Sequence, residues 1–310
     1  MSERARQMIA TRPGGPEVLE AVDVDLPDPA PDQVLVRVAA AGVNPADWKS
    51  LASGAGTPPL RPGFEVAGTI AALGSDASVV GGGGAVGDRV VAFRTVGGYA
   101  SALLVPARDV LPAPAALDDA AAANLLLAGT TAADLLHAAG VRPGETVLLH
   151  GASGAVGVSV LQQARELGVR VIGTASPGRF DEVRRFGGEP VEYGEGLEQR
   201  VRDAAPDGVD AAFDCAGTDE AFETSLALVA DRRRILTVVD PARAQRYGVQ
   251  ARGGDNSRAY RDEARARIVA LAADRRLEVP VAATFPLERA ADALELLKTG
   301  HPGGKAALIP

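Results

Sequence analysis

The sequence predicts an α/β protein in which a β-rich part is joined to a doubly wound part built on a parallel sheet. Three observations predict this class. Short apolar stretches separated by Pro, Gly and Asp clusters fill residues 7–120. An apolar run, a glycine turn and an amphipathic helix follow one another in residues 146–168. Apolar strands then alternate with helical segments through most of the second half of the chain.

Length and charge narrow the class. The chain has 310 residues, which is enough for two domains of roughly 100–200 residues each. A net charge of −8 argues against nucleic acid or an anionic membrane as a partner. The single cysteine, Cys215, rules out an intramolecular disulfide and fits a reducing compartment. Without a signal-peptide pattern or a long apolar run, we expect a cytoplasmic protein that does not span a membrane.

The β-rich part is expected to form a small barrel or sandwich. Its short apolar runs predict strands at residues 34–38, 66–70 and 89–93, separated by turn-forming residues. The glycine run at residues 81–84 is typical of a flexible hairpin tip.

Two polar groups stand out in this part. The only tryptophan, Trp48, lies near Asn44 and Asp47 in a segment interrupted by proline. Either this segment forms the wall of a pocket, or Trp48 simply packs and Asp47 caps a short helix that begins after Pro45. Glu65 stands among apolar residues and must be paired if it is buried, so we expect a structural ion pair there.

The pattern changes from β to α near residue 125. An Ala-rich helical stretch runs from residue 117 to about residue 139. Six strands with intervening helices are then expected, as a doubly wound sheet of two halves requires. A helix at 256–273, a strand at 280–285, a helix at 287–297 and a final apolar segment at 304–309 follow. The six strands are predicted at residues 147–150, 169–174, 190–193, 209–215, 234–239 and 247–251.

The glycine turn carries the strongest functional signal. Gly151, Gly154 and Gly157 are spaced three residues apart between a buried strand and an amphipathic helix. Such a turn directs unpaired helix N–H groups past the end of the strand, where a bare backbone admits a pyrophosphate. Glycine is common in this chain, with 36 of 310 residues, so a purely structural turn is the alternative. The strand, helix and second strand around the turn favour dinucleotide binding.

The second strand of this unit indicates which dinucleotide is bound. A sheet that prefers NAD carries a carboxylate at the end of this strand, about 20 residues after the glycines. Here Ser176 and Arg179 follow the strand instead, and both suit a 2′-phosphate. Asp181 comes soon after, but we expect its side chain to point away. The sequence predicts a preference for NADPH over NADH of at least about tenfold, or ~1.4 kcal/mol.

Taken together, these motifs resemble the medium-chain dehydrogenase/reductase superfamily, and within it the zinc-free NADPH:quinone oxidoreductase branch. The resemblance implies a Rossmann domain at residues 126–269 and a GroES-like β-barrel catalytic domain at 1–125 and 270–310, in a protein that is commonly a homodimer. The motifs are AGVNPAD at 41–47, PGFEVAG at 62–68, GDRV at 87–90, LLAGTTA at 126–132, HGASGAVG at 150–157, FDCAG at 213–217 and GK at 304–305.

Departures from the zinc-dependent relatives indicate the chemistry. Their catalytic Cys, His and Cys ligands are replaced here by Asn44, Phe64 and Leu127. The three histidines, His137, His150 and His301, are too far apart in the sequence to suggest a tetrahedral site. We therefore expect no zinc and no Lewis acid for alcohol oxidation. Hydride from NADPH would go to a quinone or an α,β-unsaturated carbonyl compound, in which conjugation spreads the new charge.

The resemblance also implies roles for single residues, without indicating a catalytic acid. Three of these residues have an alternative role. Tyr193 would close a strand, Cys215 would fill the core, and Lys305 would be a surface charge. The implied cofactor and substrate contacts are Asn44 and Thr130 near the nicotinamide, with Trp48 as a pocket candidate; Gly151, Gly154, Ala155 and Val156 at the pyrophosphate; Ser176, Arg179 and Tyr193 at the 2′-phosphoadenosine end; and Cys215, Ala216, Val239 and Lys305 along the rest of the cofactor channel.

Two other functions fit the same motifs. One is an enoyl reductase that acts on thioester-bound or natural-product enones, and the other is an NADPH-binding protein without catalytic activity. A zinc-dependent alcohol dehydrogenase fits less well because its ligands are missing.

Overall fold

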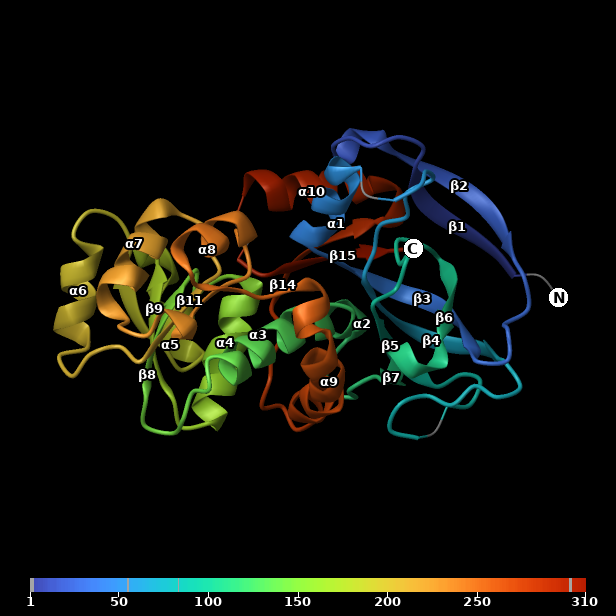
Figure 1. Cartoon of the computed structure of the whole chain (residues 1–310). Coiled ribbons are helices and arrows are strands. Elements are labelled where there is room, and N and C mark those ends of the chain that lie inside the picture. The colour runs from blue at the N-terminus through green and yellow to red at the C-terminus, as the bar shows by residue number, and fades with distance from the viewer. Residues whose placement is uncertain (1–2, 55, 83, 301–302) are drawn as a thin grey trace. The chain divides into compact units, whose positions relative to one another are not determined.

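The computed structural model describes residues 3–54, 56–82, 84–300 and 303–310 (Figure 1). The chain divides into two compact units. We call Met1–Leu127 with Ala266–Pro310 the split unit, because both ends of the chain form it, and Ala128–Arg265 the inserted unit. No helix within the described residues is both long and apolar enough to cross a bilayer.

The split unit contains a two-stranded antiparallel sheet, β1-β2, and a larger sheet in the order β14-β15-β3-β4-β5-β7, with β6 also paired to β3. Its helices are α1 (Pro45–Ser53), α2 (Asp119–Ala122) and α10 (Ala290–Thr299), with 3-10 turns at Pro16–Val18, Ala107–Asp109 and Leu287–Arg289. Its strands are β1 (Glu3–Ala10), β2 (Leu19–Leu26), β3 (Gln33–Val43), β4 (Glu65–Leu73), β5 (Arg89–Phe93), β6 (Ala102–Pro106), β7 (Val110–Pro112), β14 (Val281–Pro286) and β15 (Lys305–Ile309).

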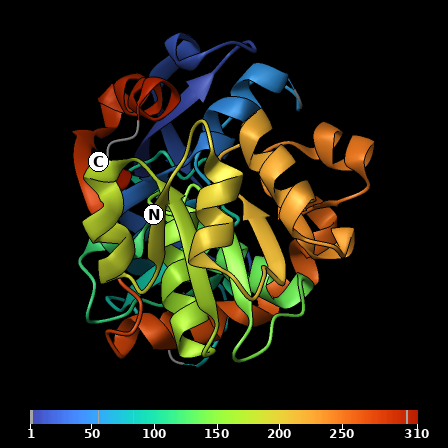
Figure 2. The ribbon, with the colours of Figure 1, turned by 90° about the vertical axis from the view of Figure 1, so that its left-hand side faces the viewer.

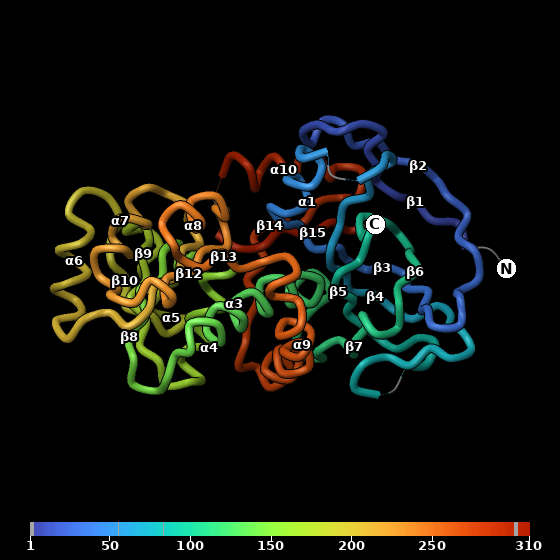
Figure 3. The backbone as a smooth tube through the Cα atoms, viewed as in Figure 1, coloured from blue at the N-terminus to red at the C-terminus, as the bar shows by residue number. Residues whose placement is uncertain are grey.

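The last strand of the chain completes this sheet. β15 pairs antiparallel with β3, with Ala306 opposite Val43, and its other edge is parallel to β14. Figure 3 follows the chain from its blue first strands to the red segment that returns to them. The predicted strands at 34–38, 66–70 and 89–93 are present within β3, β4 and β5. Local periodicity predicted these strands but not their pairing with the end of the chain.

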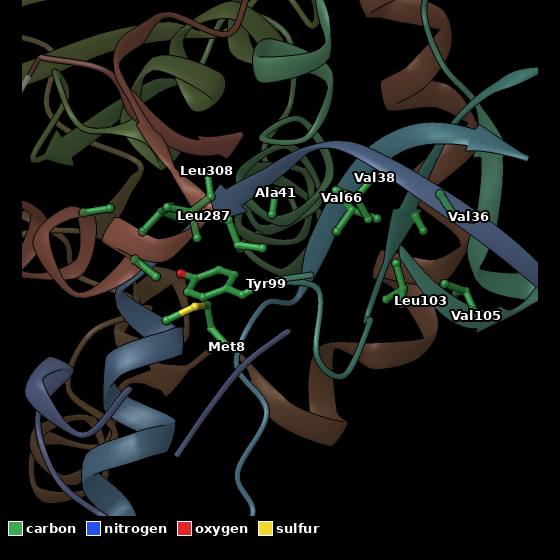
Figure 4. Packing of buried hydrophobic residues seen from close by; sticks show 14 of the residues in the cluster. Met8, Val36, Val38, Ala41, Val66, Tyr99, Leu103, Val105, Leu287 and Leu308 are labelled. Carbon is green, nitrogen blue, oxygen red and sulfur yellow. The ribbon is translucent and has the colours of Figure 1, made fainter. Parts of the chain in front are cut away.

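The core of the split unit is apolar and closely packed. Tyr99 lies in this core beside Met8 and Leu287, as Figure 4 shows. Residues from both ends of the chain contribute, since Leu308 of β15 belongs to the same buried cluster as Val36 of β3. Burying these side chains is the main favourable term for joining the two sequence segments.

The inserted unit holds a six-stranded parallel sheet in the order β10-β9-β8-β11-β12-β13, and helices lie to either side of its strands in Figure 2. From the centre of the sheet, the chain order runs outward through β8, β9 and β10 on one side and through β11, β12 and β13 on the other. Doubly wound dinucleotide-binding sheets have this reversal between their two halves. The strands are β8 (Thr146–His150), β9 (Arg170–Ala175), β10 (Glu189–Glu192), β11 (Ala211–Asp214), β12 (Ile235–Thr237) and β13 (Gln250–Ala251). The helices are α4 (Ala155–Glu166), α5 (Phe180–Arg185), α6 (Leu197–Ala204), α7 (Asp219–Leu228) and α8 (Pro241–Tyr247), with 3-10 turns at Pro177–Arg179, Arg232–Arg234 and Gly254–Ser257. Two more helices cross the boundaries of the unit: α3 (Leu126–Ala138) begins in the split unit, and α9 (Arg258–Ala273) ends in it.

Both faces of this sheet are covered, as the unbroken apolar run in β8 predicted. Leu149 belongs to one buried cluster and its neighbour Leu148 to another, on the opposite face of the strand. A strand with two covered faces has no polar alternation, because water reaches neither side.

The Ala-rich stretch at residues 117–139 is not one helix, which corrects the sequence-based expectation. It forms α2 and α3, separated at residues 123–125. The Nδ2 group of the buried Asn124 donates to Ala120 O at 2.9 Å and to Ala306 O at 3.1 Å. This tertiary contact with β15 holds the break, and helix propensity alone does not reveal it.

Candidate functional site

The glycine turn after β8 has the shape that a phosphate-binding loop needs. Gly151 has a φ of +77°, which strongly favours glycine. A Cβ on Gly157 would lie 2.3 Å from Gly151 O, because α4 packs directly against the turn. Gly154 is the N-cap of α4 and its end carries no side-chain cap. The first N–H groups of α4, on Ala155 and Val156, therefore have no intrahelical partner and fit a pyrophosphate.

Buried polar side chains hold the loops at this edge of the sheet. Thr174 Oγ1 accepts a hydrogen bond from Gly151 N at 3.3 Å. Asp214 Oδ1 accepts from Ala216 N at 3.0 Å and from Gly217 N at 2.7 Å. Because Thr174 lies in β9 and Asp214 is the last residue of β11, these two side chains tie the turns after β8 and β11 to the sheet.

Thr237 extends this arrangement to the next strand. Its hydroxyl donates to Asp214 Oδ2 at 2.8 Å and accepts from Val239 N at 3.1 Å. The sequence analysis missed Thr174, Asp214 and Thr237. The available signal was a polar residue at or near the carboxyl end of each apolar strand, where a buried polar group must find partners.

His150 and Cys215 lie at the same edge of the sheet, and the role of Cys215 along the cofactor channel stays a prediction. Burial lowers the pKa of His150 to about 4, against the opposing effect of Asp214, so the ring is neutral at pH 7. Its Nε2 lies 3.1 Å from Ser225 Oγ. Burial also raises the pKa of the Cys215 thiol. Cys215 packs against the core cluster, and its sulfur is a thiol rather than a nucleophilic thiolate near neutral pH.

The segment after β9 places Arg179 beside a carboxylate that the sequence analysis did not consider. Ser176 precedes the 3-10 turn that contains Arg179. The Asp181 side chain is 98% exposed and turns away to Arg184, 2.9 Å distant, as expected. Glu182 is the acid that faces Arg179, with 3.1 Å between Oε2 and Nε. Tyr193 lies just beyond β10 and is exposed.

Thr130 is buried in α3 rather than open to solvent. Its hydroxyl oxygen accepts a hydrogen bond from Arg261 Nε at 3.1 Å, and Arg261 comes from α9. The proposed role of Thr130 at the nicotinamide stays a prediction. Arg261 is a partner that the sequence did not indicate, because 131 residues separate the two.

A buried polar cluster lies in the split unit, where α1 begins. Asn44 N donates to Asp47 Oδ2 at 2.8 Å, and Gly63 N donates to Oδ1 at 2.9 Å. Tyr99 also donates its hydroxyl hydrogen to Asp47 Oδ2, at 3.0 Å. Burial raises the pKa of Asp47 to about 7 even though these donors lower it. Asp47 thus caps the helix that follows Pro45, as one of the two interpretations held.

The Asn44 amide is fixed from both sides. Its Nδ2 donates to Glu65 Oε1 at 3.0 Å, and Lys305 Nζ donates to its Oδ1. Glu65 also accepts from Leu127 N at 2.8 Å and lies 3.6 Å from Lys305 Nζ. The expected ion pair of Glu65 is confirmed, and Lys305 is a buried partner rather than a surface charge. Burial lowers the pKa of Lys305, while Glu65 and Asp47 oppose that shift.

Trp48 packs against the core of the split unit and is partly buried. Lys49 Nζ lies 5.9 Å from the ring centroid. Trp48 thus contacts the core, and whether it also forms the wall of a substrate pocket stays a prediction.

The resemblance implies that Asn44, Phe64 and Leu127 stand where zinc-dependent members carry their ligands, and none of these side chains is a usual zinc ligand. Within the described ranges, no group of three or more His, Cys, Asp or Glu side chains is placed to hold a metal ion. His301 lies outside the described residues.

Two family models match the chain. One describes the alcohol dehydrogenase GroES-like domain and matches residues 30–115. The other describes the zinc-binding dehydrogenases and matches residues 189–308.

Several of the related proteins and structures are named quinone oxidoreductases. A quinone oxidoreductase from Sus scrofa is 31% identical over 320 residues, which cover 96% of this chain and 95% of that protein. A quinone oxidoreductase from Rattus norvegicus is 43% identical over 168 residues, 52% of this chain, and the match spans only 50% of that protein's length. The structure of Escherichia coli quinone oxidoreductase complexed with NADPH is similar with a TM-score of 0.83, 27% identity and coverage of 98% of this chain and 100% of that one.

Proposed function

Since the chain belongs to the medium-chain dehydrogenase/reductase family, in its quinone oxidoreductase branch, we propose that it is an NADPH-dependent, zinc-independent reductase of quinones or α,β-unsaturated carbonyl compounds. One observation carries the proposal. The start of α4 after the glycine turn has no side-chain cap, and the neighbouring strand is followed by Ser176 and Arg179 without an acid at the usual position. The names of the relatives, and the NADPH bound to the Escherichia coli protein, support it.

Residues of the inserted unit would hold the cofactor. The N–H groups of Ala155 and Val156 would bind the pyrophosphate, as unpaired helix N-termini do. Ser176 and Arg179 would bind the 2′-phosphate, for which a guanidinium is well suited. NADPH, when bound, supplies the hydride, and the overall reaction consumes one proton while a quinone becomes a hydroquinone.

The substrate class follows from what replaces the zinc ligands. Asn44, Phe64 and Leu127 provide no Lewis acid to polarise an alkoxide. A quinone or enone does not need one, because its conjugated oxygen disperses the charge that arrives with the hydride and hydrogen bonds support the rest. Asn44 suits this role because Glu65 and Lys305 hold its amide in one orientation. We name no proton donor, since no residue stands out for that role and solvent can supply the proton.

The test is stopped-flow oxidation of NADPH in a chelating buffer. The acceptors are 1,4-benzoquinone, 9,10-phenanthrenequinone, simple enones and enoyl thioesters, with saturated ketones as the control. Turnover of quinones or enones, and not of ketones, supports the proposal. Turnover confined to enoyl thioesters would favour the enoyl reductase, and tight NADPH binding with no turnover would favour a non-catalytic binding protein.

We further propose a homodimer, as the resemblance to this branch implies. Sedimentation equilibrium at micromolar concentration tests this, and a mass that stays at 31.7 kDa would contradict it.

A further inference from the structure

The first turn of α5, the helix that follows β9, carries a half-buried acid that a 2′-phosphate site does not call for. Glu182 Oε2 lies 3.1 Å from Arg179 Nε, and the Glu182 side chain is only 17% exposed. Within the described chain, this oxygen is buried and accepts no hydrogen bond. The two residues therefore touch through charge alone, without the directed hydrogen bonds that make a carboxylate–guanidinium pair strong.

The acid next to it behaves differently. Asp181 is 98% exposed and forms its ion pair with Arg184 at 2.9 Å. That pair is fully hydrated and screened by salt, so it has little effect on neighbouring charges. The two adjacent carboxylates thus differ in the property that matters here, since only Glu182 lies against Arg179.

We propose that Glu182 is a specificity-determining residue that competes with the 2′-phosphate of the cofactor for Arg179 and so limits the preference for NADPH over NADH. The inference rests on the proposed function, because it assigns Arg179 to the 2′-phosphate.

Two physical effects act in the same direction. Glu182 neutralises part of the charge of Arg179, and its own negative charge repels a phosphate that approaches the same guanidinium. Burial raises the pKa of Glu182, although Arg179 and Arg185 oppose that shift. A neutral side chain of the same shape is therefore expected to fit the folded protein at least as well as the carboxylate does.

The probes are 2′,5′-ADP and 5′-AMP, which differ only in the 2′-phosphate. Each is titrated calorimetrically into the full-length protein. The variants are Glu182→Gln, the matched control Asp181→Asn, and the double variant Arg179→Ala with Glu182→Gln. In the Gln variant we expect 2′,5′-ADP to bind about tenfold more tightly, which is ~1.4 kcal/mol, while AMP affinity stays within about twofold. Asp181→Asn is expected to change neither affinity by more than about twofold, because its ion pair is exposed.

The double variant separates competition from a general charge effect. If Glu182 acts through Arg179, the gain from Glu182→Gln disappears once Arg179 is removed. An unchanged ratio of the two affinities in Glu182→Gln would overturn the inference, and so would a selective loss of 2′,5′-ADP binding, which would make Glu182 a residue that positions Arg179. Failure of wild-type protein to bind either probe or NADPH would instead overturn the proposed function.

Discussion

Replacing Lys305 with methionine tests whether the buried cluster around Asn44 is an ion-paired unit. Lys305 Nζ and Glu65 Oε1 are 3.6 Å apart and both side chains are buried. At that separation the attraction is about 5 kcal/mol at an effective dielectric constant of about 20. Removing one partner of such a pair usually costs about 3–5 kcal/mol, because a buried charge is left uncompensated. Asn44 Nδ2 and Leu127 N would still donate to Glu65, so we expect a loss of about 3 kcal/mol, the low end of that range.

The assay is urea unfolding followed by tryptophan fluorescence. Trp48 is the only tryptophan of the chain and packs in the core of the split unit, so its signal reports that unit alone. Lys305→Met should lower the free energy of unfolding, and combining it with Glu65→Gln should cost less than the sum of the single changes. The matched control is Lys298→Met in the same unit. Lys298 lies 3.5 Å from Glu295 in a half-exposed pair, so its removal should leave the midpoint unchanged.

The reasoning would be refuted by a loss below about 1 kcal/mol in Lys305→Met, which is the range of exposed pairs. Strict additivity in the double variant would also refute it, because contacting charges are expected to couple by at least about 0.5 kcal/mol.

Three further predictions concern the turn, the cofactor and pH. Gly157→Ala should lower the melting temperature and weaken NADPH binding by at least about tenfold, because the added methyl group would lie 2.3 Å from Gly151 O. The control Gly178→Ala has open space around the added methyl group, so it should leave the melting temperature unchanged. Arg179→Ala should erase most of the preference for NADPH, seen as a rise in the Kd of NADPH with little change for NADH; equal or reversed affinities in the wild type would contradict the assignment. Burial raises the pKa of Asp47 to about 7, so above about pH 4 the folded chain binds more protons than the unfolded chain. The free energy of unfolding of the split unit should therefore fall as pH rises toward about 7, with a slope that approaches ~1.4 kcal/mol per pH unit. Urea midpoints of wild type and Asp47→Asn at several pH values check this, and an equal slope in both would contradict it.

Local sequence patterns determined most of the inserted unit. The unbroken apolar run of β8 predicted a strand covered on both faces, and the glycine spacing predicted the turn into α4. Both are decided by residues within a few positions of each other, so no tertiary information is needed. The expectation of no zinc at Asn44, Phe64 and Leu127 came from the resemblance and stays a prediction, although none of these side chains is a usual zinc ligand.

Tertiary structure decided what depends on distant residues or on rotation about a helix axis. Lys305 meets Asn44 across 261 positions because β15 pairs with β3, and no local pattern encodes that pairing. Sequence proximity pointed to Asp181 as the acid near Arg179, but Glu182 faces it. Neighbouring positions on a helix point about 100° apart, so the exact start of α5 chooses which carboxylate is half-buried and which is in water.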